Sequence, residues 1–257
     1  MAQNTQITTI KQLTSKPSIQ AKINELCGKN ASSFIATMNQ IAQSYVLAKC
    51  EPMSVLGAGI TAATLNLSCN PTLGQAYIVP YGNKAQFQIG YKGLIQLALR
   101  SGQVRNINEF VVGAGQFKSY NPITGHLDVD FNVNQEGDPD GYGVYLELVN
   151  GFRKIVYWPY KKVVAHAKRF SQAYRNGKDC PWKTDFEAMA LKTVIKATLS
   201  KYAPMSTEMQ QAVSADQGVI DIETGEIEYP DNPEQLEVVG SEMPEMEDEE
   251  EENEEKK

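Results

Sequence analysis

The strongest structural pattern in this sequence lies in IVPYGNKAQFQIGYKGLIQLALRSGQ, residues 78–103. In its first half, aromatic and aliphatic residues alternate with Lys and Gln, and this period of two is typical of a β-strand. Residues 75–79 and 84–91 flank a Pro-Tyr-Gly-Asn turn, in which Gly and Asn tolerate positive φ, so the two runs are predicted to form a hairpin. Residues 93–99 then have helical periodicity. A hairpin followed directly by a helix favours an α+β fold.

Helices and strands are predicted on both sides of this hairpin. The expected helices are 30–49, 54–67, 160–170 and 184–202. The expected strands are 106–112, 116–120, 127–133, 142–149 and 152–158. Ser54 is placed to cap the second helix, and Thr184 with Glu187 forms a capping box for the last one. Asn150-Gly151 is a strong turn signal. The predicted class is α+β, with a central antiparallel β-meander and hairpins packed with helices.

The predicted helix 54–67 is rich in small residues. Gly57, Ala58, Gly59, Ala62 and Ala63 lie along it at positions where larger side chains would keep other chain segments away. Another backbone can therefore approach this helix closely. The sequence leaves open whether that backbone belongs to the core or to a neighbouring subunit.

The formal net charge of -7 averages two unlike segments. Residues 1–215 hold 22 Lys and Arg against 13 Asp and Glu, whereas residues 216–257 hold 2 Lys against 18 Asp and Glu. We expect residues 1–29 to be partly flexible, residues 30–215 to form the core, and residues 216–257 to be a disordered acidic tail, because the tail has few large apolar residues. A basic body indicates a polyanionic partner.

The positive charge of the body lies in two zones. No acidic residue occurs between Glu51 and Glu109, and residues 161–201 hold ten Lys and Arg against three acids. Lys84, Gln86 and Gln88 are expected to form one polar row on a strand, as an ordinary solvated face or as a phosphate contact. The candidate nucleic-acid contacts are Lys84, Gln86, Gln88, Lys92, Arg100, Arg105, Lys161, Lys162, Trp182, Lys183, Lys192 and Lys196.

Two members of the second zone have specific alternatives. Lys192 and Lys196 lie one helical turn apart and form a basic stripe, which serves either DNA binding or solubility. Trp182 precedes Lys183 in a predicted loop, and its ring is either part of the core or a platform for a base. If the two zones converge in space, the fold has one strongly positive face or groove.

Other classes of function have little support in the sequence. Four scattered cysteines and two histidines indicate neither a zinc site nor a disulfide framework, and we expect no metal, cofactor or catalytic residue. Gly177-Lys178 lacks the rest of a phosphate loop, which argues against an ATP-driven recombinase. The pairs Asp128/Asp130 and Asp138/Asp140 leave a metal-dependent nuclease or accessory subunit as an alternative. The polar N-terminus and the absence of a long apolar run favour a cytoplasmic protein.

Residues 78–103 strongly resemble the most recognisable segment of the RecT branch of the RecT and Red-beta superfamily of phage single-strand annealing proteins. Further segments resemble that family in the same order: PMSVLGAGITAATLNLSCNPTLGQAY (52–77), VNGFRKIVYW (149–158) and WKTDFEAMALKTVIKATLSKY (182–202). The resemblance covers roughly residues 30–215. Several long segments in one order are far more specific than a short motif.

The resemblance implies an α+β core that assembles into rings or filaments on single-stranded DNA. It also implies ATP-independent annealing of complementary strands, after a partner exonuclease exposes a single-stranded end, and a possible contact with the host single-strand binding protein. A protein that protects single strands without annealing them is a further alternative. The acidic tail is expected either to solubilise the protein or to compete with DNA and recruit other proteins.

Overall fold

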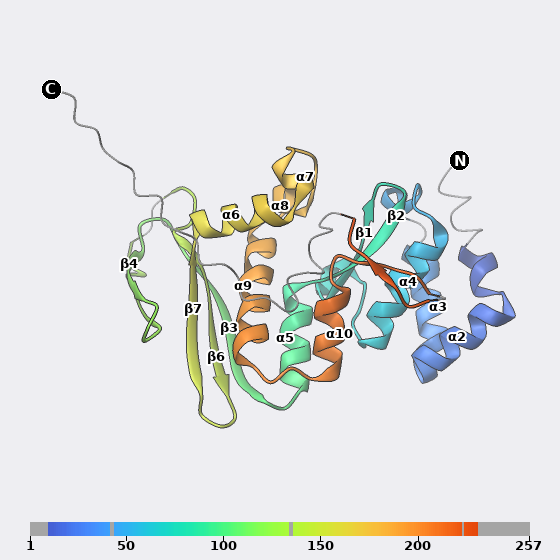
Figure 1. Cartoon of the computed structure of the whole chain (residues 1–257), viewed down its shortest axis with the longest axis horizontal. Coiled ribbons are helices and arrows are strands. Elements are labelled where there is room, and N and C mark those ends of the chain that lie inside the picture. The colour runs from blue at the N-terminus through green and yellow to red at the C-terminus, as the bar shows by residue number, and fades with distance from the viewer. Residues whose placement is uncertain (1–9, 42–43, 134–135, 223, 231–257) are drawn as a thin grey trace.

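The computed structural model describes residues 10–41, 44–133, 136–222 and 224–230 (Figure 1). Its N-terminal part packs helices against one hairpin. These elements are α2 (Pro17–Cys27), α3 (Ala31–Ile41), α4 (Pro52–Thr64), β1 (Ala76–Tyr81) and β2 (Lys84–Ile89), with short 3-10 helices at Gly28–Asn30, Tyr45–Leu47 and Pro71–Leu73. The hairpin pairs Ala76 with Ile89 and Tyr81 with Lys84.

The second part of the molecule is built on a three-stranded antiparallel sheet with the order β3–β6–β7. A long helix, α9, packs on this sheet, α5 stands beside α9, and α10 stands beside α5 (Figure 1). The elements are α5 (Tyr91–Arg100), β3 (Val104–Val112), β4 (Phe117–Asn121), β5 (His126–Val129), β6 (Gly141–Leu148), β7 (Arg153–Pro159), α6 (Tyr160–Phe170), α7 (Gln172–Arg175), α8 (Pro181–Thr184), α9 (Phe186–Tyr202) and α10 (Thr207–Ala215). The α+β class is therefore confirmed.

Two hydrophobic clusters hold these parts together. The larger cluster contains Phe87, Leu94 and Ile195, which join the hairpin to α5 and α9. The smaller one contains Ile23 and Met38 among the residues of α2, α3 and α4. Helix α4 contributes to both clusters, so the two parts form one continuous packing unit.

The small residues of α4 serve contacts within the fold. A Cβ on Gly57 would lie 2.5 Å from the backbone oxygen of Ile220, and one on Gly59 would lie 2.3 Å from the Met38 sulfur. Both distances are too short for any side chain larger than hydrogen. The sequence left open whether this surface packs in the core or against a neighbouring subunit. At Gly57 and Gly59 it packs against the chain's own core.

Turns were predicted more accurately than helix caps. The hairpin turns at Gly82 and Gly151 have φ of +60° and +88°, as the Gly and Asn in both turns predict. The capping prediction for Ser54 is wrong, because α4 begins with Pro52 and the Ser54 hydroxyl donates to Glu51 and accepts from the Ala85 N–H. The cap of α9 is Asp185 rather than Thr184.

The predicted helix 30–49 and the predicted tail also differ from the structure. Helix α3 ends at Ile41, and Tyr45–Leu47 forms a separate turn of 3-10 helix. The predicted disorder from residue 216 is wrong for residues 216–222 and 224–230, which we call the C-terminal strap. The strap contains β8 (Val219–Ile220) and β9 (Ile227–Glu228) and lies beside β2 and α4. Residues 231–257 lie outside the described residues.

The strap is anchored by a buried acid, Asp216. Its carboxylate accepts hydrogen bonds from Lys192 at 2.7 Å, Lys196 at 3.1 Å and the backbone N–H of Ile89 at 3.1 Å. Burial raises the pKa of Asp216, but the two lysine charges outweigh burial and lower it overall. Asp216 is therefore ionised, and it ties α9, β2 and the strap together.

The first prediction concerns the stability of this anchor. Asp216→Asn leaves the buried ammonium of Lys192 without its counter-charge, and breaking a buried pair in this way costs about 3–5 kcal/mol. Urea denaturation of both proteins at pH 7 measures the difference. The matched control is Asp221→Asn, at an exposed acid of the same strap, which should change stability by less than ~1 kcal/mol. Equal stability of Asp216→Asn and wild type would contradict the assignment.

Candidate nucleic-acid interface

The polar row predicted on β2 is mostly buried. Gln86 and Gln88 are 3% and 7% exposed, so the expectation that they form an exposed row is wrong. The reason is that α4, α10 and β8 pack against β2, which pairs with β1 along one edge and has a single bridge from Phe87 to Gly218 of the strap on the other. Only Lys84 reaches solvent, and it pairs with Glu228 at 2.6 Å. The hydrogen bond and charge of Glu228 raise the pKa of Lys84.

Lys92 is an exposed cation at the start of α5. Its ammonium lies 5.8 Å from the ring centre of Tyr91. A Cβ on Gly74 would lie 3.2 Å from the Lys92 stem and 3.3 Å from the Tyr77 hydroxyl, so Lys92 and Tyr77 flank the same loop. The sequence prediction missed Tyr77, although the period of two places it opposite Gln88 on the hairpin.

Lys161, Lys162 and Lys183 are exposed on the second part of the fold. Lys161 and Lys162 lie in the first turn of α6, and Lys183 lies in α8. The Lys162 ammonium lies 4.4 Å from the ring centre of Trp158, and Lys183 donates to the carbonyl of Gly177. These contacts hold the cations at defined positions on the surface.

The starts of three helices converge between these lysines. Asp185 lies at the start of α9, and its charge adds to burial in raising the pKa values of Tyr77 and Tyr91 at the hairpin and α5. The ring centres of Tyr160, at the start of α6, and Phe186 lie 5.4 Å apart. The N-terminal ends of α5, α6 and α9 therefore gather in one region.

We call this region the helix-start patch, and the exposed cations that the first turns of α5 and α6 and the short α8 supply to it are Lys92, Lys161, Lys162 and Lys183. Burial and the charge of Lys201, in the last turn of α9, lower the pKa of Lys162, so its ammonium is the least exposed to the patch. In Figure 1, α6, α7, α8 and the turn of the β1–β2 hairpin all lie along the upper edge of the molecule. The partial positive charge at each helix N-terminus adds to the charge of the lysines. Asp185 and Glu187 lie in the same region and reduce the net positive charge there.

Trp182 is buried, so the alternative that assigned it to the core is the one the structure supports. Its ring centre lies 5.5 Å from Phe186 and 6.2 Å from Tyr174. Trp158 and His166 belong to the same aromatic cluster, with their ring centres 5.6 Å apart. Sequence adjacency to Lys183 suggested exposure, but α8 turns the two side chains in different directions. A base cannot stack on Trp182 without opening this cluster.

The basic stripe on α9 is directed into the protein. Lys192 is 5% exposed and Lys196 is partly buried, and both bind Asp216. The prediction that Lys192 is available at the surface is wrong, because its counter-charge comes from a residue that the sequence placed in the tail. The remaining exposed part of Lys196 faces the neighbourhood of His166, whose pKa it helps to lower.

Arg100 and Arg105 lie away from the helix-start patch. Arg100 ends α5, roughly 12 Å along the helix from Lys92, and donates to the Leu65 carbonyl at 2.6 Å. Arg105 at the start of β3 lies 3.7 Å from Glu147, which Arg153 also contacts at 3.1 Å. Of the first predicted basic zone, Lys92 thus lies near the second zone, whereas Arg100 and Arg105 lie away from it.

The acidic pairs have local structural partners. Asp130 pairs with Lys118 at 3.1 Å, and the Asp140 carboxylate accepts the backbone N–H of Phe117 at 2.8 Å. In the part of the chain that the structure describes, no three His, Cys, Asp or Glu side chains are grouped so that they could hold a metal ion. The same described residues include no helix long and apolar enough to cross a membrane.

Exposed lysines near converging helix starts, on an α+β fold, form the kind of surface that nucleic-acid-binding proteins use for phosphate groups. The RecT family model matches residues 29–231, and the chain belongs to the RecT family. It is 47% identical over 206 residues to "Uncharacterized protein YqaK" of Bacillus subtilis, covering 80% of this chain and 71% of that protein. It is 33% identical over 192 residues to "Protein RecT" of Escherichia coli, covering 71% of this chain and 69% of that protein.

Membership of the RecT family supports a role in DNA recombination by single-strand annealing. The predicted family resemblance is therefore confirmed, and DNA binding follows from it. Proteins of this family are annealing proteins rather than known catalytic enzymes.

The second prediction concerns His166 in the aromatic cluster. Burial, with smaller contributions from Lys196, Arg169 and Lys162, lowers the pKa of His166 to about 4. The unfolded chain binds this proton near pH 6.5, whereas the folded chain binds it only near pH 4, so stability falls as pH decreases between these values. The full difference is about 3 kcal/mol.

Urea unfolding at pH 7 and pH 4 measures this effect. His166→Phe keeps a ring in the cluster and should lose about 3 kcal/mol less than wild type on acidification. His126→Gln, at the exposed histidine of β5, is the matched control. An identical acid dependence in wild type and His166→Phe would show that His166 is not held neutral by the fold.

Proposed function

We propose that this protein binds single-stranded DNA and anneals it to a complementary strand without ATP, as an oligomer or filament on the DNA. The observation that carries the proposal is the helix-start patch. Lys92, Lys161, Lys162 and Lys183 come from three helices and are exposed together, while the neighbouring large rings are packed in the core. Such a surface suits a phosphate backbone and leaves the bases free.

Free bases are what an annealing protein requires. A base stacked on a protein ring gains ~1–3 kcal/mol, and it must give up that contact before it can pair with a complement. Trp158 and Trp182 are only 6% and 5% exposed, so neither tryptophan offers a ring face for stacking, whereas Tyr77 beside Lys92 is 36% exposed. Affinity then comes from cations and phosphates, so sequence selectivity is low and salt dependence is strong.

Several further features belong to the proposal. The partners are single-stranded DNA and its annealed duplex product, further copies of this chain, a partner exonuclease and the host single-strand binding protein. We place the protein in the cytoplasm and assign it no nucleotide cofactor and no catalytic step. Of these features, membership of the RecT family supports the binding and annealing of single-stranded DNA.

The third prediction concerns the phosphate contacts. Each lost contact to a single strand lowers the slope of log affinity against log salt by ~0.7, so Lys92→Ala with Lys183→Ala should lower it by about 1.4. Fluorescence anisotropy with a labelled oligothymidine at several salt concentrations measures the slope. The matched control is Lys11→Ala with Lys16→Ala, two exposed lysines at the N-terminal end of the fold. Equal slopes for the two double variants would show that Lys92 and Lys183 do not contact the phosphates of the DNA.

The fourth prediction concerns annealing itself. Two complementary labelled oligonucleotides, incubated with the protein in chelator and without ATP, should pair faster than without protein. Strand loss that chelator blocks would instead indicate the nuclease alternative. Binding without faster pairing would indicate a protective single-strand binding protein. The Lys92→Ala, Lys183→Ala variant should anneal more slowly than the Lys11→Ala, Lys16→Ala control.

A further inference from the structure

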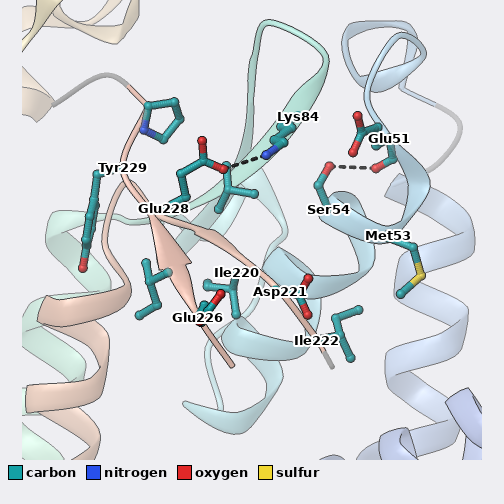
Figure 2. Close-up of a pocket in the computed structure, with 13 residues that line it drawn as sticks. Glu51, Met53, Ser54, Lys84, Ile220, Asp221, Ile222, Glu226, Glu228 and Tyr229 are labelled. Atoms are coloured by element: carbon teal, nitrogen blue, oxygen red, sulfur yellow. Dashed lines mark hydrogen bonds and ion pairs between the residues drawn. The ribbon is translucent and has the colours of Figure 1, made fainter. Parts of the chain in front are cut away.

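The C-terminal strap supplies an ion-pair partner to Lys84, the cation of the β2 row that reaches solvent. Figure 2 shows Glu228 extending from β9 toward Lys84, with the ion pair drawn between them. Lys84 was predicted from sequence as a phosphate contact, and its partner here is a carboxylate from the same chain. An anionic group therefore already lies where a DNA phosphate would approach Lys84.

The two ends of the strap are held very differently. At its start, Asp216 is 1% exposed and bound by two lysines. The backbone N–H of Phe87 in β2 donates to the Gly218 carbonyl at 2.9 Å, and the Gln217 N–H donates to the Phe87 carbonyl at 2.8 Å. At its far end, the Lys84 and Glu228 side chains are 37% and 63% exposed. An exposed pair of this kind is weak and is screened by salt.

The backbone of the strap is packed on the body of the protein, although a cavity of about 910 Å³ lies between β8, β9, the start of α4 and the start of β2 (Figure 2). Val219, Ile222 and Tyr229 are each 8% exposed, and Ile220 lies against Gly57 of α4. The Glu228 side chain is 63% exposed, so it can leave Lys84 while the strap stays packed.

The sequence after the strap strengthens its negative charge. Residues 231–257 contain thirteen Asp and Glu and two Lys, and they follow Glu228 by only two residues. The strap therefore fixes the origin of this acidic segment close to Lys84. Local negative charge at this point opposes the approach of a polyanion.

We propose that the Glu228 side chain is an autoinhibitory cover of Lys84, in which its carboxylate occupies the position of a DNA phosphate and is displaced when single-stranded DNA binds. This inference rests on the proposed function, because DNA is the competing polyanion. Asp216 and the packed strands of the strap stay in place during the displacement.

A matched pair of charge variants tests the competition. Glu228→Gln removes the carboxylate that pairs with Lys84, and Glu226→Gln removes an equal charge from an exposed neighbour on the same strap. Glu228→Gln should bind oligothymidine about fivefold more tightly than Glu226→Gln at 50 mM salt, and the difference should vanish at high salt. Equal affinity of the two variants at low salt would overturn the proposal.

The same titration separates this inference from the proposed function. If wild type and both variants bind oligothymidine equally well, the cover is wrong but single-strand binding stands. If none of the three binds, the proposed function fails and the cover fails with it. Thermal unfolding of each variant, with transitions within a few degrees of wild type, ensures that affinity differences do not arise from unfolding.

Discussion

The fold depends on one buried charge, the carboxylate of Asp216. Two lysines of α9 and a backbone N–H of β2 bind it, so it joins the long helix of the second part of the molecule to the hairpin of the first. A buried acid is tolerated only when cations and donors surround it, and here each surrounding group is itself fixed by a packed element. The hydrophobic clusters supply most of the stabilising surface. Asp216 determines how the strap lies on them.

This arrangement also decides which positive charges remain for a partner. Lys192 and part of Lys196 are neutralised inside the protein, and Lys84 is matched by Glu228. Among the cations left at the surface, Lys92, Lys161 and Lys183 lie near the starts of α5, α6 and α9. In the proposed interface, DNA binding relies on this small set of exposed lysines on rigid elements, with the buried rings of Trp158 and Trp182 nearby. That combination favours contact with the strand backbone over contact with the bases.

The sequence predicted local features well and long-range pairing poorly. Alternation and turn residues located the β1–β2 hairpin and the turn at Gly151, because those signals lie within a few residues. The same alternation placed Gln86 and Gln88 on one face of β2. It did not predict that α4 and the strap pack against this strand. Charge counting placed Asp216 in the tail, since its partners are 20 and 24 residues away in sequence. The sequence left the exposure of Trp182 open, because its position next to Lys183 does not determine in which direction its side chain points.

Lysine footprinting tests the central claim that the helix-start patch, and not the α9 stripe, meets DNA. The full-length protein is acetylated with and without bound oligothymidine, and each site is quantified by mass spectrometry. The account predicts that Lys92, Lys161, Lys162 and Lys183 react in the free protein and are protected in the complex, while Lys192 is unreactive in both. A reactive Lys192 that DNA protects, with unchanged labelling of the four patch lysines, would contradict it.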